Sequence, residues 1–260
     1  MEAVILAAGR GSRLGDATTD VPKPMVQLAG RTLFERTVEQ FHAHGINRIT
    51  AVTGYRADQL PTGGLRVVHN DWWQTTGIAF SLLQADAHLT ESVIVAYSDI
   101  VFEPAVLQAL LSHDHDGVSI AVNTDWRRLW EHRMDDVLAD AESLRRTDDW
   151  AITEIGQPAA TVDDVQGQFM GLIRIDRSAQ DRFFGLYRDA LRTEPLDGSP
   201  APSPGLWDMT TWLTRWLDAG EHLAGVPVHG GWLEIDTVTD LDTYIRLHAT
   251  GELTSICALD

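Results

Sequence analysis

Residues 1–15 read MEAVILAAGRGSRLG, an apolar run that ends at Gly9 and continues as glycines interleaved with arginines. A P-loop requires GxxxxGK followed by Ser or Thr, and this stretch lacks that pair. A dinucleotide-binding loop has the spacing GxGxxG, whereas Gly9, Gly11 and Gly15 are spaced GxGxxxG. With these two loop types excluded, the stretch is interpreted as a glycine loop at the carboxyl end of a first strand. In α/β sheets ligands bind at this end, and free backbone N–H groups of such a loop can bind phosphates. A purely structural turn is the alternative.

Outward from this loop, predicted strands and helices alternate along the chain. Buried apolar runs predict strands, and helical spacing of apolar residues predicts helices. The expected strands are Glu2–Ala7, Arg48–Thr53, Leu65–His69, Ser92–Tyr97 and Val118–Asn123. The expected helices are Leu33–His44, Ile78–Ala87 and Glu103–Ser112. This alternation predicts an α/β layered fold with a mostly parallel sheet.

The pattern changes after Asp125. SLRRTDDWAITEIG (143–156) predicts two short strands around a polar turn, and QGQFMGLIRID (166–176) predicts another strand. Helices are expected at Ser178–Arg192 and Met209–Leu217, on either side of the proline-rich loop at 197–205. A strand and a helix in GGWLEIDTVTDLDTYI (230–245) end the chain, and without a repeat or a long linker 1–260 is expected to be one domain.

Composition and charge exclude several classes of protein. The chain has 260 residues, 44% of them hydrophobic, so it can bury a full core. Cys257 is its only cysteine, which excludes an internal disulfide and fits a reducing compartment. No segment has the length of a membrane span, and the run at 3–8 is shorter than a signal-peptide core, so we expect a cytoplasmic protein without a membrane partner.

The formal net charge of −18 disfavours nucleic-acid partners and makes each basic residue informative. Lys23, between two prolines in VPKPM (21–25), is the only lysine. Its compact ammonium on a flexible stem is not reproduced by the planar guanidinium of arginine. We therefore expect Lys23, with Arg10 and Arg13, to neutralise a bound phosphate; an incidental surface lysine is the alternative.

Longer motifs resemble a known family. AVILAAGRGSRL (3–14) followed by VPKPMVQLAGRTLFERTVEQFHAHGI (21–46) resembles the signature of nucleotidyltransferases with a GT-A-like Rossmannoid fold. Four later stretches resemble the branch of this family that transfers CMP to phosphocholine, phosphoglutamine or phosphonates. They are TTGIAFSLLQA (75–85), VAYSDIVFEPAVLQALL (95–111), QGQFMGLIRID (166–176) and GGWLEIDTVTDLDTY (230–244). The resemblance implies a Rossmann-like α/β/α sandwich with a small antiparallel subregion on the acceptor side. Residues 1–125 would form the nucleotide-binding part and 126–260 the acceptor-binding part.

The same resemblance assigns roles to residues. The nucleotide would contact Ala7, Ala8, Gly9, Gly11, Ser12, Arg13, Lys23, Thr76 and Ser81. Asp99, Glu234 and Asp236 would hold Mg²⁺ as cofactor, which agrees with its preference for carboxylate and phosphate oxygens. Glu234 and Asp236 alternate in extended chain and so point to one side. Helix capping is the alternative for Asp99 and Asp236.

The implied reaction is in-line attack of an acceptor oxygen on the α-phosphorus of CTP, with pyrophosphate leaving. A phosphate or phosphonate acceptor is largely dianionic near neutral pH, so no general base is needed. Lys23, Arg13 and Asp99 are the predicted catalytic residues, acting with Mg²⁺ by positioning and charge neutralisation.

The acceptor is predicted from TDWRRLWEHR (124–133). Arg127, Arg128 and Arg133 are expected to bind a small phosphonate or phosphate that also carries a carboxylate, since guanidinium forks fit these oxygens. An aromatic cage for a quaternary ammonium is the alternative, built from Trp126, Trp130, Trp207 and Trp212. The histidines of SHDHDG (112–117) are expected in a solvated loop.

Two other functions remain open on the sequence. A sugar-1-phosphate nucleotidyltransferase would prefer UTP, dTTP or GTP and usually carries a longer insertion for the sugar. A nucleotide-binding module would bind CTP without turnover, although both predicted sets of metal-binding carboxylates count against it.

Overall fold

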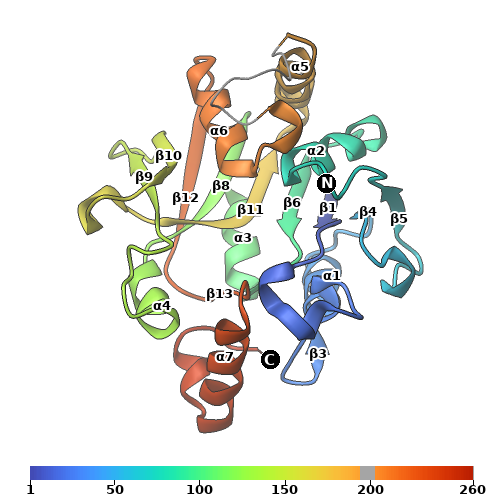
Figure 1. Cartoon of the computed structure of the whole chain (residues 1–260). Coiled ribbons are helices and arrows are strands. Elements are labelled where there is room, and N and C mark those ends of the chain that lie inside the picture. The colour runs from blue at the N-terminus through green and yellow to red at the C-terminus, as the bar shows by residue number, and fades with distance from the viewer. Residues whose placement is uncertain (194–202, 260) are drawn as a thin grey trace.

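The computed structural model describes residues 1–193 and 203–259, and its centre is a seven-stranded sheet (Figure 1). Its strands are β1 (Glu2–Ala7), β4 (Ile49–Thr53), β5 (Arg66–His69), β6 (Val93–Tyr97), β8 (Val118–Asn123), β11 (Gln168–Ile175) and β12 (Leu223–Val228). Their order is β12-β8-β11-β6-β1-β4-β5. All neighbours are parallel except β11, which is antiparallel to β6 and β8. The predicted α/β sandwich with a mostly parallel sheet is confirmed.

Helices cover both faces of this sheet. They are α1 (Leu33–Ala43), α2 (Ile78–Ala85), α3 (Pro104–Ser112), α4 (Trp126–Arg133), α5 (Arg177–Thr193), α6 (Met209–Asp218) and α7 (Val238–Thr250). Side chains alternate across a strand, so Ala3 and Ile5 of β1 pack in one apolar core with α1, α3 and α7. Val4 and Leu6 pack in the other core with α2, α5 and α6, which lie together at the top of Figure 1.

Three two-stranded antiparallel sheets accompany the main sheet. They pair β2 (Gln27–Leu28) with β3 (Arg31–Thr32), β7 (Ile100–Phe102) with β13 (Trp232–Glu234), and β9 (Glu142–Arg146) with β10 (Ile152–Pro158). The β7–β13 pair positions the site, because Glu234 lies opposite Ile100 and the Ile235 N–H donates to the Asp99 carbonyl at 2.9 Å. Two acidic segments far apart in the sequence therefore meet at the end of β6.

Most predicted elements lie within one or two residues of the observed ones. The sequence analysis gave no element to α4, β7 or β12; α4 has eight residues and β7 has three, fewer than the window in which apolar periodicity is recognised. Of the predicted proline-rich loop, 197–202 lie outside the described residues, and Pro204–Leu206 form a 3₁₀ turn. No helix in the described ranges has the length and apolarity that crossing a membrane requires.

Candidate active site

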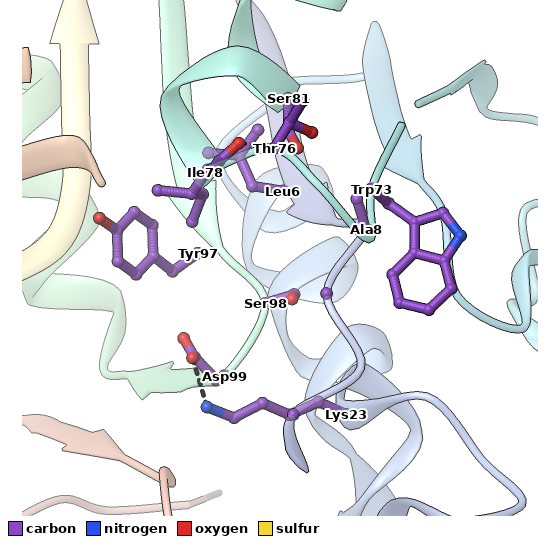
Figure 2. A pocket seen from close by; sticks show the side chains of 13 residues that line it. Leu6, Ala8, Lys23, Trp73, Thr76, Ile78, Ser81, Tyr97, Ser98 and Asp99 are labelled. Carbon is purple, nitrogen blue, oxygen red and sulfur yellow. Dashed lines mark hydrogen bonds and ion pairs between the residues drawn. The ribbon is translucent and has the colours of Figure 1, made fainter. Parts of the chain in front are cut away.

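A cavity of about 200 Å³ opens beyond the carboxyl ends of β1 and β6 (Figure 2). Six of the nine residues predicted to contact the nucleotide line it: Ala8, Gly9, Gly11, Lys23, Thr76 and Ser81. The other three do not. Ala7 is buried in the core, Ser12 begins the 3₁₀ segment Ser12–Thr18, and Arg13 lines a second cavity beside the first.

The glycine loop allows the buried lysine to approach the backbone. Gly11 has φ 74°, and a Cβ built on it would lie 2.6 Å from the Cβ of Lys23. The Thr18 hydroxyl donates to the Gly11 carbonyl at 2.8 Å and fixes the turn. Glycine is therefore required at this position both for its backbone conformation and for the close packing of Lys23.

Lys23 links two of the predicted carboxylates. Its Nζ donates to Asp99 Oδ2 and to Asp236 Oδ1, each at 2.6 Å, and the residue is 8% exposed. Burial disfavours the ammonium, but the charges of Asp99 and Asp236 outweigh burial and raise the pKa of Lys23. The side chain is therefore a fixed cation at the edge of the cavity (Figure 2).

Neither of these aspartates is a helix cap. The N-cap of α3 is Glu103, and the N-cap of α7 is Thr237, whose hydroxyl accepts from the Asp240 N–H. The capping alternative for Asp99 and Asp236 is therefore excluded by the structure, and both carboxylates are directed to Lys23.

The carboxylates of this region suit a hard cation. Asp140, Glu234 and Asp236 each offer one oxygen within 4.8 Å of the others, and Asp99 Oδ1 is buried without a hydrogen-bond partner among the described residues. Oxygen donors of this kind are the ligands that Mg²⁺ prefers. The sequence analysis named Asp99, Glu234 and Asp236; it missed Asp140, which lies in a loop without a motif.

Asn70 is a second residue that the sequence analysis missed. It is fully buried, and its Nδ2 donates to the hydroxyls of Thr76 and Ser81, both at 3.0 Å. Its Oδ1 accepts from the Trp72 N–H, which fixes the orientation of the amide. Asn70 therefore orients the two hydroxyls that line the cavity. An asparagine directly after the β5 strand was the available signal.

The second cavity has a volume of about 240 Å³ and is strongly acidic. Tyr97 lines both cavities, and Asp236, which binds Lys23 in the first, also lines the second. Arg13 lies at this junction, 63% exposed, and its Nη2 donates to Asp236 Oδ1 at 3.1 Å. A nucleotide in one cavity and a second substrate in the other would therefore meet beside Lys23, Arg13 and the carboxylates.

The three arginines predicted to bind the acceptor do not gather at this cavity. Arg127 is exposed and pairs with Glu131 on its own helix, and Arg128 donates to Ser255. Neither lines either cavity, and Arg133 has no exposed side-chain surface. The segment is the helix α4, which directs neighbouring side chains to different sides, so the expected arginine cluster does not form.

Arg133 is buried and instead binds the carboxylates of Asp240 and Glu234 from inside the fold. Its Nε donates to Asp240 at 2.9 Å and its Nη1 to Glu234 at 3.1 Å. Asp240 also accepts from the N–H of Asp236 and of Thr237, at 3.0 and 2.9 Å. Burial and the charge of Asp236 raise the pKa of Glu234 well above its usual range, whereas Arg133 opposes that rise. The arginine thus connects α4 to the β13–α7 turn.

The structure also shows where the four tryptophans of the predicted cage and the two histidines of the predicted loop lie. Trp126 and Trp130 belong to one apolar core and Trp207 and Trp212 to the other, so the four do not form a cage. His113 and His115 lie on the loop before β8, and the group of possible metal-binding residues found in the described ranges does not include them.

The fold is shared with solved nucleotidyltransferases. The chain aligns over 99% of its length with 97% of the inositol-1-phosphate CTP transferase of T. maritima, at a TM-score of 0.72 and 21% identity. That likeness establishes the fold. Residues 3–186 match the family model of the MobA-like NTP transferase domain, so the chain belongs to that family and is a nucleotidyltransferase.

Two curated relatives are cytidylyl-transferring proteins by name. The CTP:phosphoglutamine cytidylyltransferase of Campylobacter jejuni is 28% identical over 95% of this chain and 100% of its own length. The CMP-5'-(3-aminopropyl)phosphonate synthase of Streptomyces rubellomurinus is 35% identical over 42% of this chain, a match that spans 19% of that larger protein. The resemblance predicted from sequence motifs is confirmed.

Proposed function

We propose that the protein transfers CMP from CTP to a small phosphate or phosphonate metabolite and releases pyrophosphate. The observation that carries this proposal is the Lys23 ammonium, held at 2.6 Å from both Asp99 and Asp236 where two cavities meet. The names of the two relatives, a CTP-dependent transferase and a CMP-phosphonate synthase, support the choice of CTP and of the acceptor class.

CTP would bind with its base beside Thr76 and Ser81 and its phosphates at the glycine loop and Lys23. Asn70 holds both hydroxyls as hydrogen-bond acceptors toward its amide, so their orientation is fixed before the base arrives. Gly77, which lines the cavity, packs against the backbone of Trp207, where a Cβ would lie 2.1 Å from the carbonyl oxygen. The proposed preference for a pyrimidine base rests on the two relatives whose names contain CTP or CMP.

The acceptor oxygen would then attack the α-phosphorus from the second cavity. One P–O bond forms to the acceptor, and the bond between the α-phosphorus and pyrophosphate breaks, so no proton has to be removed. Lys23 and Arg13 place two positive charges where the negative charges of both substrates converge. Catalysis would come from this positioning and from charge neutralisation.

Magnesium is implied by the resemblance to the family, and the oxygen donors described above fit it. Asp99 and Asp236, with Asp140 and Glu234 beside them, would hold the ion. When bound, the ion supplies further positive charge to the phosphates and orients them.

Pyrophosphate release tests the proposal. The protein is incubated with Mg²⁺ and CTP, UTP, GTP, dTTP or ATP, each with and without a panel of small phosphonates, phosphate esters and hexose 1-phosphates. We expect release from CTP only when a phosphonate or phosphate ester is present. Preference for UTP or dTTP with a hexose 1-phosphate would favour the sugar-nucleotide alternative, and CTP binding without release under any condition would favour a non-catalytic module.

A further inference from the structure

Three histidines that the proposed function does not use lie at the end of the sheet opposite the active site. His113 and His115 lie on the loop before β8, and His222 directly precedes β12. These two strands are parallel, with Val118 opposite Leu223, so the two loops enter the sheet side by side. β8 runs in the same direction as β6, because both are antiparallel to β11. The histidines therefore lie at the amino ends of the strands, whereas the active site lies at the carboxyl ends.

His115 and His222 bring one ring nitrogen each close together. His115 Nε2 and His222 Nδ1 are 3.3 Å apart, and the ring centroids are 4.9 Å apart. Two nitrogen ligands at about 2.0–2.1 Å from a tetrahedral ion are separated by about 3.3–3.4 Å. Two nitrogen lone pairs that face each other at this distance repel unless a proton or a metal ion lies between them. The spacing therefore suits an ion bound by both imidazoles.

The surrounding structure fixes the backbone of both histidine loops. A Cβ built on Gly117 would lie 2.4 Å from His115 Nε2, so a glycine is needed where this imidazole lies against the chain. The Gly117 carbonyl accepts from the Asp176 N–H at 2.9 Å. Trp216 Nε1 donates to the His222 carbonyl, also at 2.9 Å. The two nitrogens are therefore held near each other before an ion binds, which lowers the cost of ordering the ligands.

The charges around the pair favour a cation. Both histidines line a cavity of about 220 Å³ together with residues of α5 and α6, the helices at the top of Figure 1. Asp116 and Glu221 also line it, and Glu221 binds Arg182 there at 2.6 Å. The lining thus holds two carboxylates and one guanidinium, which disfavours an anionic ligand. Burial and the charges of the neighbouring histidines lower the pKa of His115, which favours the neutral imidazole that binds metal ions.

We propose that His115 and His222 bind a divalent transition-metal ion of the zinc type, at a site separate from the active site. Imidazole nitrogen suits such ions, whereas Mg²⁺ prefers oxygen. The described residues place no third histidine, cysteine or carboxylate close enough to both nitrogens, so water would complete the coordination. The ion would join two loops that are 107 residues apart in the sequence.

Calorimetric titration of the metal-free protein with Zn²⁺, in the presence of excess Mg²⁺, tests this inference. Zn²⁺ also binds carboxylates, so the active site can contribute a second event, and the variants identify which event belongs to the histidines. We expect one event to be lost in His115→Ala and in His222→Ala. Gly117→Ala keeps both imidazoles but displaces the His115 ring, and it should weaken the same event about tenfold or more.

His42→Ala is the matched control, since this exposed histidine of α1 lies outside the three cavities. It should keep every event, and circular dichroism checks that each variant is folded. A wild-type protein without a Zn²⁺ event beyond those that the His115 and His222 variants retain would overturn the inference and leave the pair as a hydrogen bond only. Because the readout is Zn²⁺ binding, this result does not depend on whether the protein transfers CMP.

Discussion

At the scale of single residues, the packing and the ion pairs of Lys23 leave little room for a different side chain. It is the only lysine of the chain, packs on Gly11, and places one ammonium between two carboxylates at 2.6 Å each. A guanidinium is longer and planar, and it cannot occupy the same point. The alternative of an incidental surface lysine does not agree with a residue that is 8% exposed.

We predict that Lys23→Arg binds CTP within a small factor of the wild-type protein but loses most of its kcat. A displacement of reacting groups by about 1 Å costs roughly a hundredfold in rate. Lys23→Ala should lose both turnover and CTP affinity. The measurements are kcat and the Kd of CTP for each variant, and normal turnover of Lys23→Arg would remove Lys23 from the reaction.

We also predict that Asp99→Asn and Asp236→Asn each reduce turnover about a hundredfold or more and leave the fold intact. Losing a metal-binding carboxylate removes several kcal/mol of transition-state stabilisation, while Lys23 keeps the other carboxylate as partner. Turnover at several Mg²⁺ concentrations and circular dichroism check the two parts. Near-normal activity of either variant at limiting Mg²⁺ would contradict the assignment.

At the scale of elements, α4 connects the site to the rest of the fold. The helix contributes Trp130 to the core, and its last residue, Arg133, holds Asp240 and Glu234. Asp240 lies in the capping box of α7 with Thr237, so the same carboxylate orders the helix start and binds the arginine. The position of Asp236 therefore depends on contacts between α4 and α7 as well as on its own strand.

Arg133→Met should lower the free energy of unfolding by about 3–5 kcal/mol, because removing one partner of a buried ion pair leaves uncompensated charge. Arg128→Met, on the same helix, is the control: its side chain is 47% exposed and its ion pair to Asp125 should contribute about 1 kcal/mol or less. Urea unfolding measures both. Equal losses in the two variants would show that Arg133 has no special structural role.

At the scale of the whole molecule, one sheet contains strands from both predicted parts of the chain. β11 and β12 from 126–260 lie in the same sheet as β1, β4, β5, β6 and β8 from 1–125, with β11 inserted between β8 and β6. Neither part holds a complete sheet alone. The prediction of one domain over 1–260 leads us to expect a single cooperative unfolding transition.

Ligand binding should shift that transition. At a CTP concentration one hundred times its Kd, with Mg²⁺, binding stabilises the folded state by about 2.7 kcal/mol, which for a chain of this size raises Tm by about 5–10 °C. We expect GTP and ATP at the same concentration to give a smaller shift, measured by scanning calorimetry. A larger shift with a purine nucleotide would contradict the predicted preference, and two separate transitions would contradict the single domain.

The sequence by itself determined the layered α/β fold, the glycine loop, Lys23 and the pair Asp99 and Asp236. Apolar periodicity and motif spacing are local properties, so they can be recognised before the chain is folded. The tertiary structure alone decided that Asn70 orients the hydroxyls of Thr76 and Ser81, and that Glu142 and Asp208 line one cavity while the arginines of α4 do not gather there. These residues lie on short elements and loops, and where they point depends on how distant segments pack, which no local pattern encodes.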